Sequence, residues 1–376
     1  MPKLLYIVTE DWFFASHFLP MARAARNAGF DVAVATRVGD KAQSIAAAGC
    51  RVVPLDASRR GIGPIEVVRN LAQAYRIVRT EQPDIVHCIA LKPVVLGGLA
   101  ARWAGAPRLV LAPTGLGHLW TESGVLARAG RGIVRLVAGH WLRGPRTRYI
   151  FENGDDPIEF GLDPRAPEVT VVGGAGVDPS DYPFTPEPPA PPVKVAVVSR
   201  MIAPKGIAEA VAAVQCARAL GAPVELHLFG APDESNRRAI PETILRQWSS
   251  GPGVTWHGRV TDIARVWREH HVAILLTSYR EGVPRALIEA AASGRPIVTT
   301  DTPGCRDIAR DGGTLVAPGD IEAAAGALVR LAGDPALRAR LGAAANATFR
   351  AGFTEEGVRR AVAELYRSML APRVLA

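Results

Sequence analysis

The sequence predicts an α/β protein with two Rossmann-like domains whose parallel sheets face each other across an interdomain cleft. Three observations support this fold class. Short β-rich runs alternate with longer helical patterns in both halves, which is typical of a parallel sheet covered by helices on both faces. The chain has 376 residues, more than one hydrophobic core usually spans. A proline-dense run between the halves predicts a linker without regular structure.

The predicted boundaries give an N-terminal domain at 1–177, a linker at 178–192 and a C-terminal domain at 193–376, whose last helix could pack back on the N-terminal domain. The strands expected in the first domain are Leu4–Val8, Asp31–Thr36, Val52–Leu55, Asp84–Cys88, Leu109–Ala112, Tyr149–Phe151 and Val169–Val172. Its expected helices are His17–Ala28, Lys41–Ala48, Ile65–Thr80, Val94–Ala104 and Val125–Leu142. The strands expected in the second domain are Lys194–Ser199, Val224–Phe229, Val254–Trp256, Val272–Thr277, Ile297–Thr300 and Leu315–Val316.

Composition excludes several classes of protein. Hydrophobic residues make up 48% and charged residues 21% of the chain, an ordinary profile for a soluble α/β protein. The 4 cysteines form no Cys-x-x-Cys pair, so neither a disulfide framework nor a zinc site is expected, and a reducing compartment fits. The first residues predict a strand rather than a signal peptide, and no apolar run is long enough to span a bilayer. We therefore expect a cytoplasmic protein.

The net charge is +8, and the stretch from Gly124 to Arg148 is strongly basic. It contains no acidic residue and holds the arginines Arg128, Arg131, Arg135, Arg143, Arg146 and Arg148. The first three share one helical face, whereas Leu126, Ile133, Val137 and Trp141 can pack elsewhere. Such a basic amphipathic helix could lie on the anionic cytoplasmic face of the inner membrane, or it could be a solvated surface helix. Nucleic acid is not an expected partner, because no recognition motif is present.

The segment Ser278–Glu289 is the most informative of the chain. His271 to Thr277 reads as a buried strand, Gly282 allows a tight turn, and Pro284 suits the first position of a helix. A helix N-terminus beside a glycine offers free backbone N–H groups and partial positive charge. Gly282, Val283 and Pro284 are therefore candidates to bind an anion such as a diphosphate.

Two carboxylates flank this turn. Glu289 lies in an otherwise apolar helix, where burial would cost several kcal/mol unless hydrogen-bond donors such as ribose hydroxyls meet it. Glu281 could meet the hydroxyls of a sugar at the lip of the cleft. The competing interpretation is that Glu289 pairs with Arg285, four residues earlier, in the weaker of the two orders for a helical ion pair.

Two cations follow the first strand of the second domain. Arg200 and Lys205 would both reach a pyrophosphate at the nearby helix start, the arginine through bidentate bonds and the lysine as a point charge. The alternative is that both are solvated surface cations.

These residues resemble the signature of retaining GT-B glycosyltransferases of the family 4 type, which has two glutamates separated by seven residues. The continuation Ser293–Val298 fits as well. The resemblance implies that Glu281 serves the donor sugar and Glu289 binds the nucleotide ribose. The segment Ser199–Gly206 is similar to the family's Gly-Arg-Leu…Lys-Gly motif, with Ser199 in place of the usual glycine. In the same family the backbone around Arg259 and Val260 would border the nucleotide base.

The N-terminal half resembles bacterial members that extend polysaccharides or lipid-linked sugars. The turn Thr9–Phe18 looks like their opening, although Phe18 replaces the basic residue that usually follows the histidine. The candidate acceptor-binding residues are Glu10, Ser16, His17 and Lys92. An N-cap role is the alternative for Ser16, and Lys92 would meet an acceptor phosphate. Thr114 stands where many relatives have a histidine, and with Gly115 it is expected to hold the donor sugar.

The resemblance implies a retaining, metal-independent transfer of a sugar from a nucleotide diphosphate, with uridine preferred, to a carbohydrate or polyprenyl-diphosphate-linked acceptor. No side chain stands out as a covalent nucleophile. Arg200, Lys205 and the helix N-terminus would stabilise the leaving diphosphate in place of a metal, and no Asp-x-Asp motif occurs at a suitable strand end. No cofactor is expected.

Two rival functions remain open. One is a sugar-nucleotide epimerase of the same architecture, and the other is a catalytically silent subunit that only binds nucleotide sugars. The paired glutamates argue against the epimerase. The two cations together with both glutamates argue against the catalytically silent subunit, although Thr114, in place of the histidine of many relatives, leaves this alternative open. A dehydrogenase is disfavoured, because no Gly-x-Gly-x-x-Gly follows the first strand of either half.

Overall fold

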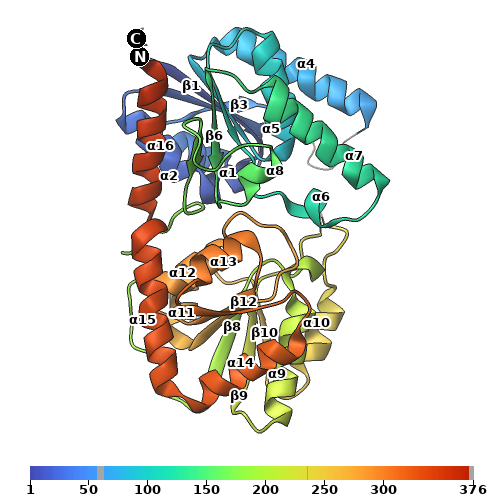
Figure 1. The fold of residues 1–376 in the computed structure, drawn as a ribbon, viewed down its shortest axis with the longest axis vertical. Helices are drawn as coiled ribbons and strands as arrows, with labels where there is room; N and C mark the ends of the chain where they lie inside the picture. Colours follow the sequence, from blue (N-terminus) through green and yellow to red (C-terminus); the bar gives the residue numbers. More distant parts are fainter. Residues whose placement is uncertain (57–62, 235, 372–376) are drawn as a thin grey trace. The chain divides into compact units, whose positions relative to one another are not determined.

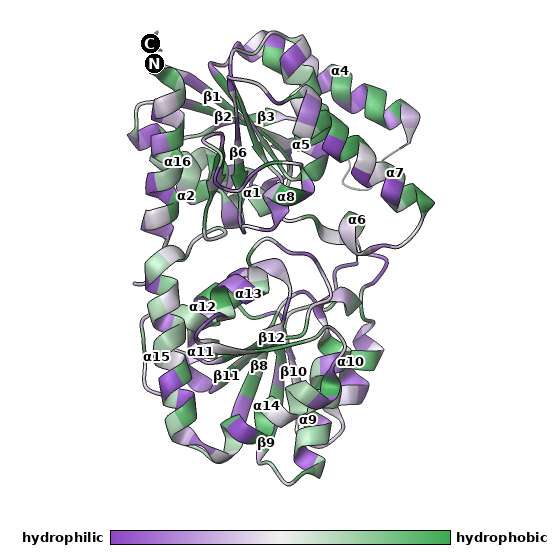
Figure 2. Cartoon of the chain, in the orientation of Figure 1, coloured by the Kyte–Doolittle hydropathy of each residue, from purple (hydrophilic) through white to green (hydrophobic). Residues whose placement is uncertain are grey.

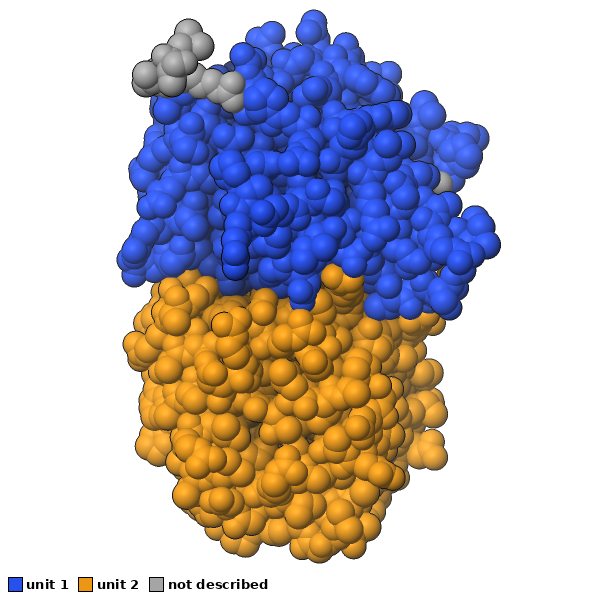
Figure 3. Space-filling model, in the orientation of Figure 1, with its two compact units in different colours: residues 1–175, 355–376 blue, residues 176–354 orange. Residues whose placement is uncertain are grey.

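The computed structural model describes residues 1–56, 63–234 and 236–371. The chain forms two compact units (Figure 3), one made of Met1–Ala175 with Glu355–Ala376 and the other of Gly176–Thr354. The expected linker, residues 178–192, is therefore part of the second unit, and the last helix is part of the first. Both units are α/β with an all-parallel sheet, which is the architecture of the GT-B fold.

The sheet of unit 1 has seven strands in the order β3-β2-β1-β4-β5-β6-β7. The strands are β1 Lys3–Glu10, β2 Asp31–Arg37, β3 Arg51–Pro54, β4 Ile85–Ile89, β5 Leu109–Ala112, β6 Thr147–Phe151 and β7 Val169–Val171. The helices are α1 Asp11–His17, α2 Leu19–Asn27, α3 Ala42–Ala47, α4 Pro64–Glu81, α5 Leu91–Trp103, α6 Gly117–Thr121, α7 Val125–Val134, α8 Asp156–Glu159 and α16 Glu355–Leu370. A π-helical stretch, Arg135–Trp141, continues α7.

Alternating residues of the unit 1 strands belong to two hydrophobic cores, one on each face of the sheet. Leu4, Tyr6 and Val8 of β1 pack with α1, α2 and α16 on one face, whereas Leu5 and Ile7 pack toward α4, α5 and the π-helix on the other. Helices α2 and α16, from opposite ends of the chain, run side by side (Figure 1). The last helix therefore completes the core of the first unit.

The sheet of unit 2 has six strands in the order β10-β9-β8-β11-β12-β13. The strands are β8 Val193–Val198, β9 Val224–Phe229, β10 Val254–Gly258, β11 Val272–Leu275, β12 Ile297–Thr300 and β13 Gly313–Val316. The helices are a 3-10 turn Ala203–Lys205, then α9 Ile207–Ala219, α10 Glu242–Ser249, α11 Ile263–Glu269, α12 Arg285–Ala292, α13 Pro303–Ala309, α14 Ile321–Gly333 and α15 Pro335–Gly352. Helices α9 and α14 cover one face, and α11, α12, α13 and α15 cover the other. Hydrophobic residues mark the strands and the inner faces of these helices (Figure 2).

The proline-dense segment is held on unit 2 mainly by side chains, with one long backbone hydrogen bond of 3.5 Å from the N–H of Thr185 to the carbonyl oxygen of Ser293. Arg338 donates to both carboxylate oxygens of Glu187 at 2.8 Å. The buried guanidinium of Arg295 donates to the carbonyl oxygens of Thr185 and Pro186 at 3.0 and 3.1 Å. Prolines lack the N–H that a strand needs but keep their carbonyl acceptors. Arginine donors from the body of the unit therefore replace a hydrogen-bonded ladder.

The expected helix 125–142 is present as α7 and the π-helix. Of the apolar residues that can pack away from its arginine face, Val137 is buried, whereas Leu126, Ile133 and Trp141 are exposed. Arg131 binds neighbouring protein groups, since it donates to the carbonyl oxygens of Leu119 and Glu122. Within the described residues, no helix is both long and apolar enough to cross a bilayer.

Candidate functional site

The candidate site of unit 2 lies where the strand order reverses. Strands β8 and β11 are parallel neighbours, with Val195 opposite Val272, while β9 flanks β8 and β12 flanks β11 on the outer sides. The connections after β8 and β11 therefore leave in opposite directions. Such a switch point at the carboxyl ends of parallel strands is where α/β sheets bind ligands. The loops 199–206 and 276–284 both start there.

Lys205 and Glu281 meet at this point. The Nζ atom of Lys205 lies 2.7 Å from Oε1 and 2.6 Å from Oε2 of Glu281, and both side chains are more than four-fifths shielded from solvent. Each comes from a different loop, so the pair joins the connection after β8 to the one after β11. The arrangement places a cation and a carboxylate together at the switch point, in a charge-assisted hydrogen-bonded pair.

A glycine allows the loop after β8 to come close to the loop after β11. Gly206 has φ +70°, and a Cβ atom built on it would lie 2.0 Å from the carbonyl oxygen of Leu276. Any side chain there would both strain the backbone and push the second loop away. A similar contact fixes the turn before α12, because a Cβ atom on Gly304 would lie 1.2 Å from the carbonyl oxygen of Gly282. Tight backbone packing therefore sets the spacing of the loops.

Arg200 is ion-paired as well. Its Nη1 atom lies 2.7 Å from Oδ2 of Asp233, in the loop after β9, and the arginine side chain remains 40% exposed. Ser199, beside it, uses its hydroxyl to donate to the carbonyl oxygen of Arg200 at 3.1 Å. Both cations therefore have a carboxylate partner, and of the two only Arg200 remains largely accessible to solvent, as the alternative interpretation of solvated surface cations expects.

Glu289 is buried in α12 and pairs with Arg285, which was the competing interpretation. Nε of Arg285 lies 2.9 Å from Oε1 of Glu289, and the hydroxyl of Tyr182 donates to the same oxygen at 3.1 Å. Burial raises the pKa of Glu289, while Arg285 and Tyr182 act in the opposite direction. The buried carboxylate is thus met by donors of the protein itself, and its predicted bonds to ribose hydroxyls remain a prediction.

Helix α12 begins at Arg285, one residue later than expected, with Pro284 as the residue that caps it. Pro284, at the N-cap position, makes no side-chain hydrogen bond to the N-terminal N–H groups of this helix. Gly282, Val283 and Pro284 are all buried in the turn that leads to it. The predicted role of this turn in anion binding remains a prediction.

The loop after β10 carries Arg259, which is exposed, and Val260, which packs against the hydrophobic core beside α12. Before it, His257 stacks on Phe229 with ring centroids 4.5 Å apart and shares a hydrogen bond of 2.9 Å with Nδ1 of His227. These contacts make His257 a packing residue at the end of β10.

In unit 1, the stretch expected to be a turn at Thr9–Phe18 instead contains α1. Glu10 ends β1 and accepts from Nη2 of Arg37 at 2.7 Å. Ser16 lies near the end of α1, where its hydroxyl donates to the carbonyl oxygen of Phe13 and lies 2.6 Å from Nδ1 of His17. The N-cap alternative for Ser16 is therefore wrong, because α2 is preceded by Phe18.

Lys92 lies in the first turn of α5, directly after the β4 loop. Its Nζ atom is 3.9 Å from Oε1 of Glu66 on α4, and burial lowers the pKa of Lys92. Since β1 and β4 are neighbours at the reversal of strand order in unit 1, Glu10 and Lys92 both come from strands at that switch point.

Two non-glycine residues at this edge of unit 1 have a positive φ. Ala90 follows β4 with φ 71°, and Thr114 follows β5 with φ 57°. Gly115 continues the same turn with φ 93°. Such conformations cost about 1–3 kcal/mol each and cluster at binding sites. The strain supports a functional role for the loop that holds Thr114.

Three residues at the unit 2 site were missed from the sequence: Tyr182, Asp233 and Thr277. Thr277 could have been found, because it is the polar last residue of the strand expected at Val272–Thr277, which leads to the switch point. Asp233 carried a weaker signal, as an acid shortly after the strand-end glycine Gly230. Nothing in the sequence marked Tyr182, which reaches Glu289 only through the path of the proline-dense segment.

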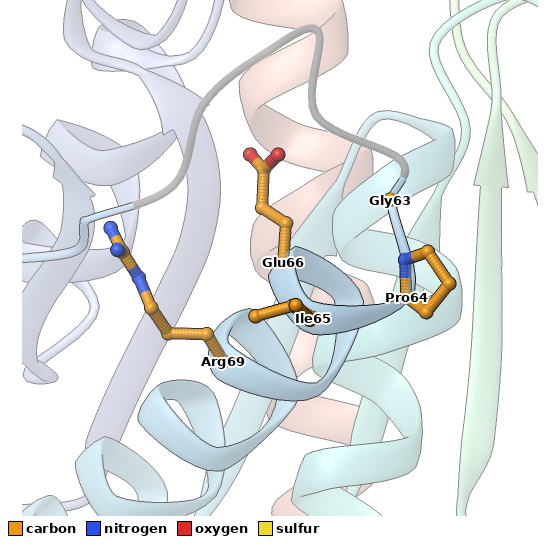
Figure 4. Close-up of a pocket in the computed structure, with 5 residues that line it drawn as sticks. All are labelled: Gly63, Pro64, Ile65, Glu66 and Arg69. Atoms are coloured by element: carbon orange, nitrogen blue, oxygen red, sulfur yellow. The ribbon is translucent and has the colours of Figure 1, made fainter.

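The described residues contain no group of three His, Cys, Asp or Glu side chains arranged to hold a metal ion. A depression of about 340 Å³ lies at the start of α4 in unit 1 and is lined by Gly63, Pro64, Ile65, Glu66 and Arg69 (Figure 4). Its lining is mostly apolar and brings no nucleophile or phosphate-binding loop together. We therefore do not assign the donor to it.

Comparisons with protein families match both halves of the chain. Residues 3–128 match the family described as glycosyl transferase 4-like, and residues 192–334 match the glycosyl transferases of group 1. A curated relative from Campylobacter jejuni is N,N'-diacetylbacillosaminyl-diphospho-undecaprenol α-1,3-N-acetylgalactosaminyltransferase. It is 24% identical over 305 residues, which cover 77% of this chain and 78% of the relative.

Solved structures are similar over nearly the whole chain. HepE of Anabaena in complex with UDP-glucose has a TM-score of 0.76 at 17% identity, and the alignment covers 98% of this chain and 100% of HepE. A glycosyltransferase from Rickettsia africae has a TM-score of 0.76 at 15% identity, covering 99% of both chains. At this identity the structures establish the shared fold.

Proposed function

We propose that this protein, which belongs to the group 1, GT4-like glycosyltransferases, transfers a sugar from a UDP-sugar donor to a hydroxyl of a polyprenyl-diphosphate-linked saccharide. The family consists of retaining enzymes with the GT-B fold. The donor class is supported by the UDP-glucose complex of HepE. The acceptor class is supported by the Campylobacter relative, whose name specifies an undecaprenol-linked substrate. The protein would then act in cell-surface polysaccharide or glycan assembly.

The observation that carries the proposal is the Lys205–Glu281 pair at the switch point of unit 2. Transfer requires that the leaving diphosphate be stabilised as its negative charge develops. Lys205 and Arg200 supply positive charge for this step, and the turn Gly282–Pro284 supplies the N-terminus of α12. These groups do the work that a divalent metal does in other transferases, so we propose a metal-independent reaction.

The carboxylates bind the carbohydrate parts of the donor. Glu281 accepts hydrogen bonds from the sugar once Lys205 turns to the diphosphate. Glu289 exchanges the donors it has in the structure, Arg285 and Tyr182, for the ribose hydroxyls. Such an exchange keeps a buried carboxylate hydrogen-bonded throughout, which avoids the cost of leaving it unsatisfied.

The remaining assignments follow the family. Ser199, Arg259 and Val260 border the nucleotide, and Thr114 and Gly115 hold the sugar. Glu10, Ser16, His17 and Lys92 bind the acceptor, with Lys92 at its phosphate. No covalent nucleophile is invoked, since in a retaining reaction of this type the acceptor attacks on the face that the diphosphate leaves.

We also propose that unit 1 rests on an anionic membrane through α7 and the π-helix. Large apolar side chains are exposed along this stretch: Val125, Leu126, Ile133, Leu136 and Trp141. The stretch mixes strongly apolar and strongly polar residues (Figure 2), and Arg128 is exposed on it, as is Arg146 shortly after its end. Exposed apolar groups beside arginines favour the interface of an anionic bilayer, where a lipid-linked acceptor would be found.

The test combines binding and turnover. A thermal-shift panel of nucleotide sugars identifies the donor, because a ligand at about 100 times its Kd adds roughly 2.7 kcal/mol of stability. With that donor, UDP release should require a polyprenyl-diphosphate saccharide. Isomerised donor without acceptor would indicate an epimerase instead. Binding without any release across an acceptor panel would indicate a non-catalytic subunit.

A further inference from the structure

Thr277 connects the two loops that meet at the unit 2 site. Its hydroxyl oxygen lies 3.0 Å from the carbonyl oxygen of Pro204, in the turn that carries Lys205. The same hydroxyl lies 3.1 Å from Oε1 of Glu281. It also accepts the backbone N–H of Tyr279 at 3.0 Å, and the side chain is fully buried. Bulk water therefore does not compete for these hydrogen bonds.

The hydroxyl faces two acceptors but has only one hydrogen to donate. The two acceptors depend on it unequally. The carbonyl oxygen of Pro204 already accepts the backbone N–H of Ser278 at 3.0 Å. Oε1 of Glu281 receives its other hydrogen bond from Nζ of Lys205 at 2.7 Å. If Lys205 moves away, the carboxylate loses this donor while the carbonyl keeps its own.

Building on the proposed function, we propose that Thr277 is a positioning residue that frees Lys205 for the donor diphosphate. When Lys205 turns to the diphosphate, the hydroxyl of Thr277 rotates from Pro204 to Glu281 and replaces the lysine as hydrogen-bond donor. The carboxylate stays oriented toward the sugar, and breaking the ion pair costs less. Without the hydroxyl, Glu281 would hold Lys205 more firmly against the incoming diphosphate.

The experiment measures nucleotide affinity by titration calorimetry on the full chain. UDP, GDP and ADP are first titrated into the wild type, and the tightest binder is the probe. We expect Thr277→Val, which keeps the shape but removes the hydroxyl, to weaken binding about tenfold, the scale of one hydrogen bond to a charged group. Thr277→Ser keeps the hydroxyl and should restore affinity to within about twofold of wild type.

Thr299→Val is the matched control. Thr299 is also a fully buried threonine, on the neighbouring strand β12, and its hydroxyl donates to the carbonyl oxygen of Leu275 at 2.6 Å. It bonds to no carboxylate in the part of the chain that the structure describes, so its loss should leave nucleotide affinity nearly unchanged. If Thr299→Val weakens binding as much as Thr277→Val, the effect is general to the sheet and the proposal is overturned.

A double-mutant cycle separates positioning from folding. In a Glu281→Gln background the lysine is no longer held by an opposite charge, so adding Thr277→Val should change affinity by less than about twofold. An undiminished tenfold effect there would show that Thr277 does not act through Glu281. Melting curves accompany each variant, and Thr277→Ala replaces the valine variant throughout the cycle if the latter does not fold.

The two proposals fail in different ways. If the wild type binds none of the three nucleotides, the proposed function fails and takes this inference with it. If the wild type binds one of them and Thr277→Val binds it equally well, only the role of Thr277 is overturned. Turnover gives a second readout, because kcat should fall with Thr277→Val and recover with Thr277→Ser.

Discussion

The Nζ atom of Lys205 lies within 2.7 Å of both carboxylate oxygens of Glu281, so the cation proposed for the donor diphosphate is held by the acid proposed for the donor sugar. The pair has two consequences. It places the lysine at the switch point of the sheet before any ligand arrives, and it neutralises both charges in a largely shielded position. Removing either partner leaves the other charge uncompensated.

Lys205→Ala or Arg200→Ala should lower kcat/KM for sugar transfer by about 2–4 kcal/mol, the scale for one electrostatic donor to the transition state. Initial rates at varied donor concentration measure the effect. Arg360→Ala is the control, because Arg360 is an exposed cation paired with Glu356 on α16, outside unit 2. A loss of less than about threefold with Lys205→Ala would argue against the phosphate assignment.

Turnover should persist in EDTA, since fixed cations and the N-terminus of α12 stabilise the leaving group. The assay follows UDP release after dialysis against chelator, with and without added Mg²⁺ or Mn²⁺. An enzyme that stops on chelation and recovers with Mn²⁺ would contradict the metal-independent mechanism.

Binding to anionic vesicles should depend on the exposed apolar residues of α7 and the π-helix. The double substitution Leu126→Ser with Trp141→Ser removes side chains that are 89% and 57% exposed, so the fold should tolerate it while co-sedimentation falls. Ile65→Ser on α4 is the control, because that side chain is equally exposed but lies outside the arginine-rich stretch. Wild-type protein that stays in the supernatant at low salt would rule out the membrane proposal.

Stability should fall as the solution is acidified from pH 7 to pH 5. Burial lowers the pKa of His270 to about 3 and that of His227 to about 4, while nearby Glu225 acts weakly in the opposite direction on His227. The unfolded chain takes up protons near pH 6.5 and the folded chain does not. Stability is therefore full above pH 6.5 and decreases as the pH falls toward the folded values, by about 2 kcal/mol for each histidine by pH 5.

Denaturant titrations at pH 7 and pH 5 measure the slope of the free energy of unfolding against pH. His270→Phe removes one buried imidazole and should flatten the slope, whereas His140→Gln, at an exposed position, should not. Equal slopes in the wild type and His270→Phe would show that this imidazole does not set the acid limit.

Tyr366→Phe should destabilise unit 1 by about 1–3 kcal/mol, the cost of leaving buried polar groups unpaired. The hydroxyl of Tyr366, on α16, lies 2.7 Å from Nδ1 of His87 and 2.9 Å from the hydroxyl of Tyr6. These bonds join the last helix to strands β4 and β1. Tyr75→Phe, at a partly exposed site on α4, is the control, and matching melting temperatures for the two variants would contradict the prediction.

Much of the fold followed from hydrophobic patterning. Every strand expected in both units is present, and Leu109–Ala112 and Val224–Phe229 have the expected bounds. Strands buried on both faces read as short apolar runs between glycines and polar residues, which is a local signal. Helix α1 was missed because Asp11–His17 is a short segment between β1 and the pattern of the next helix, and a turn was expected there from the sequence.

The sequence by itself determined the alternation of strands and helices, the family, and the residue types at the candidate site. The tertiary structure alone decided which charges meet. Lys205 and Glu281, or Arg200 and Asp233, are far apart along the chain and become neighbours only because parallel strands end at one edge of a sheet. The same holds for Tyr182 on Glu289 and for α16 on the core of unit 1. Local hydrophobic patterns indicate which residues are buried. Which charged side chains pair with each other depends on the order of the strands in the sheet, and no short stretch of sequence encodes that order.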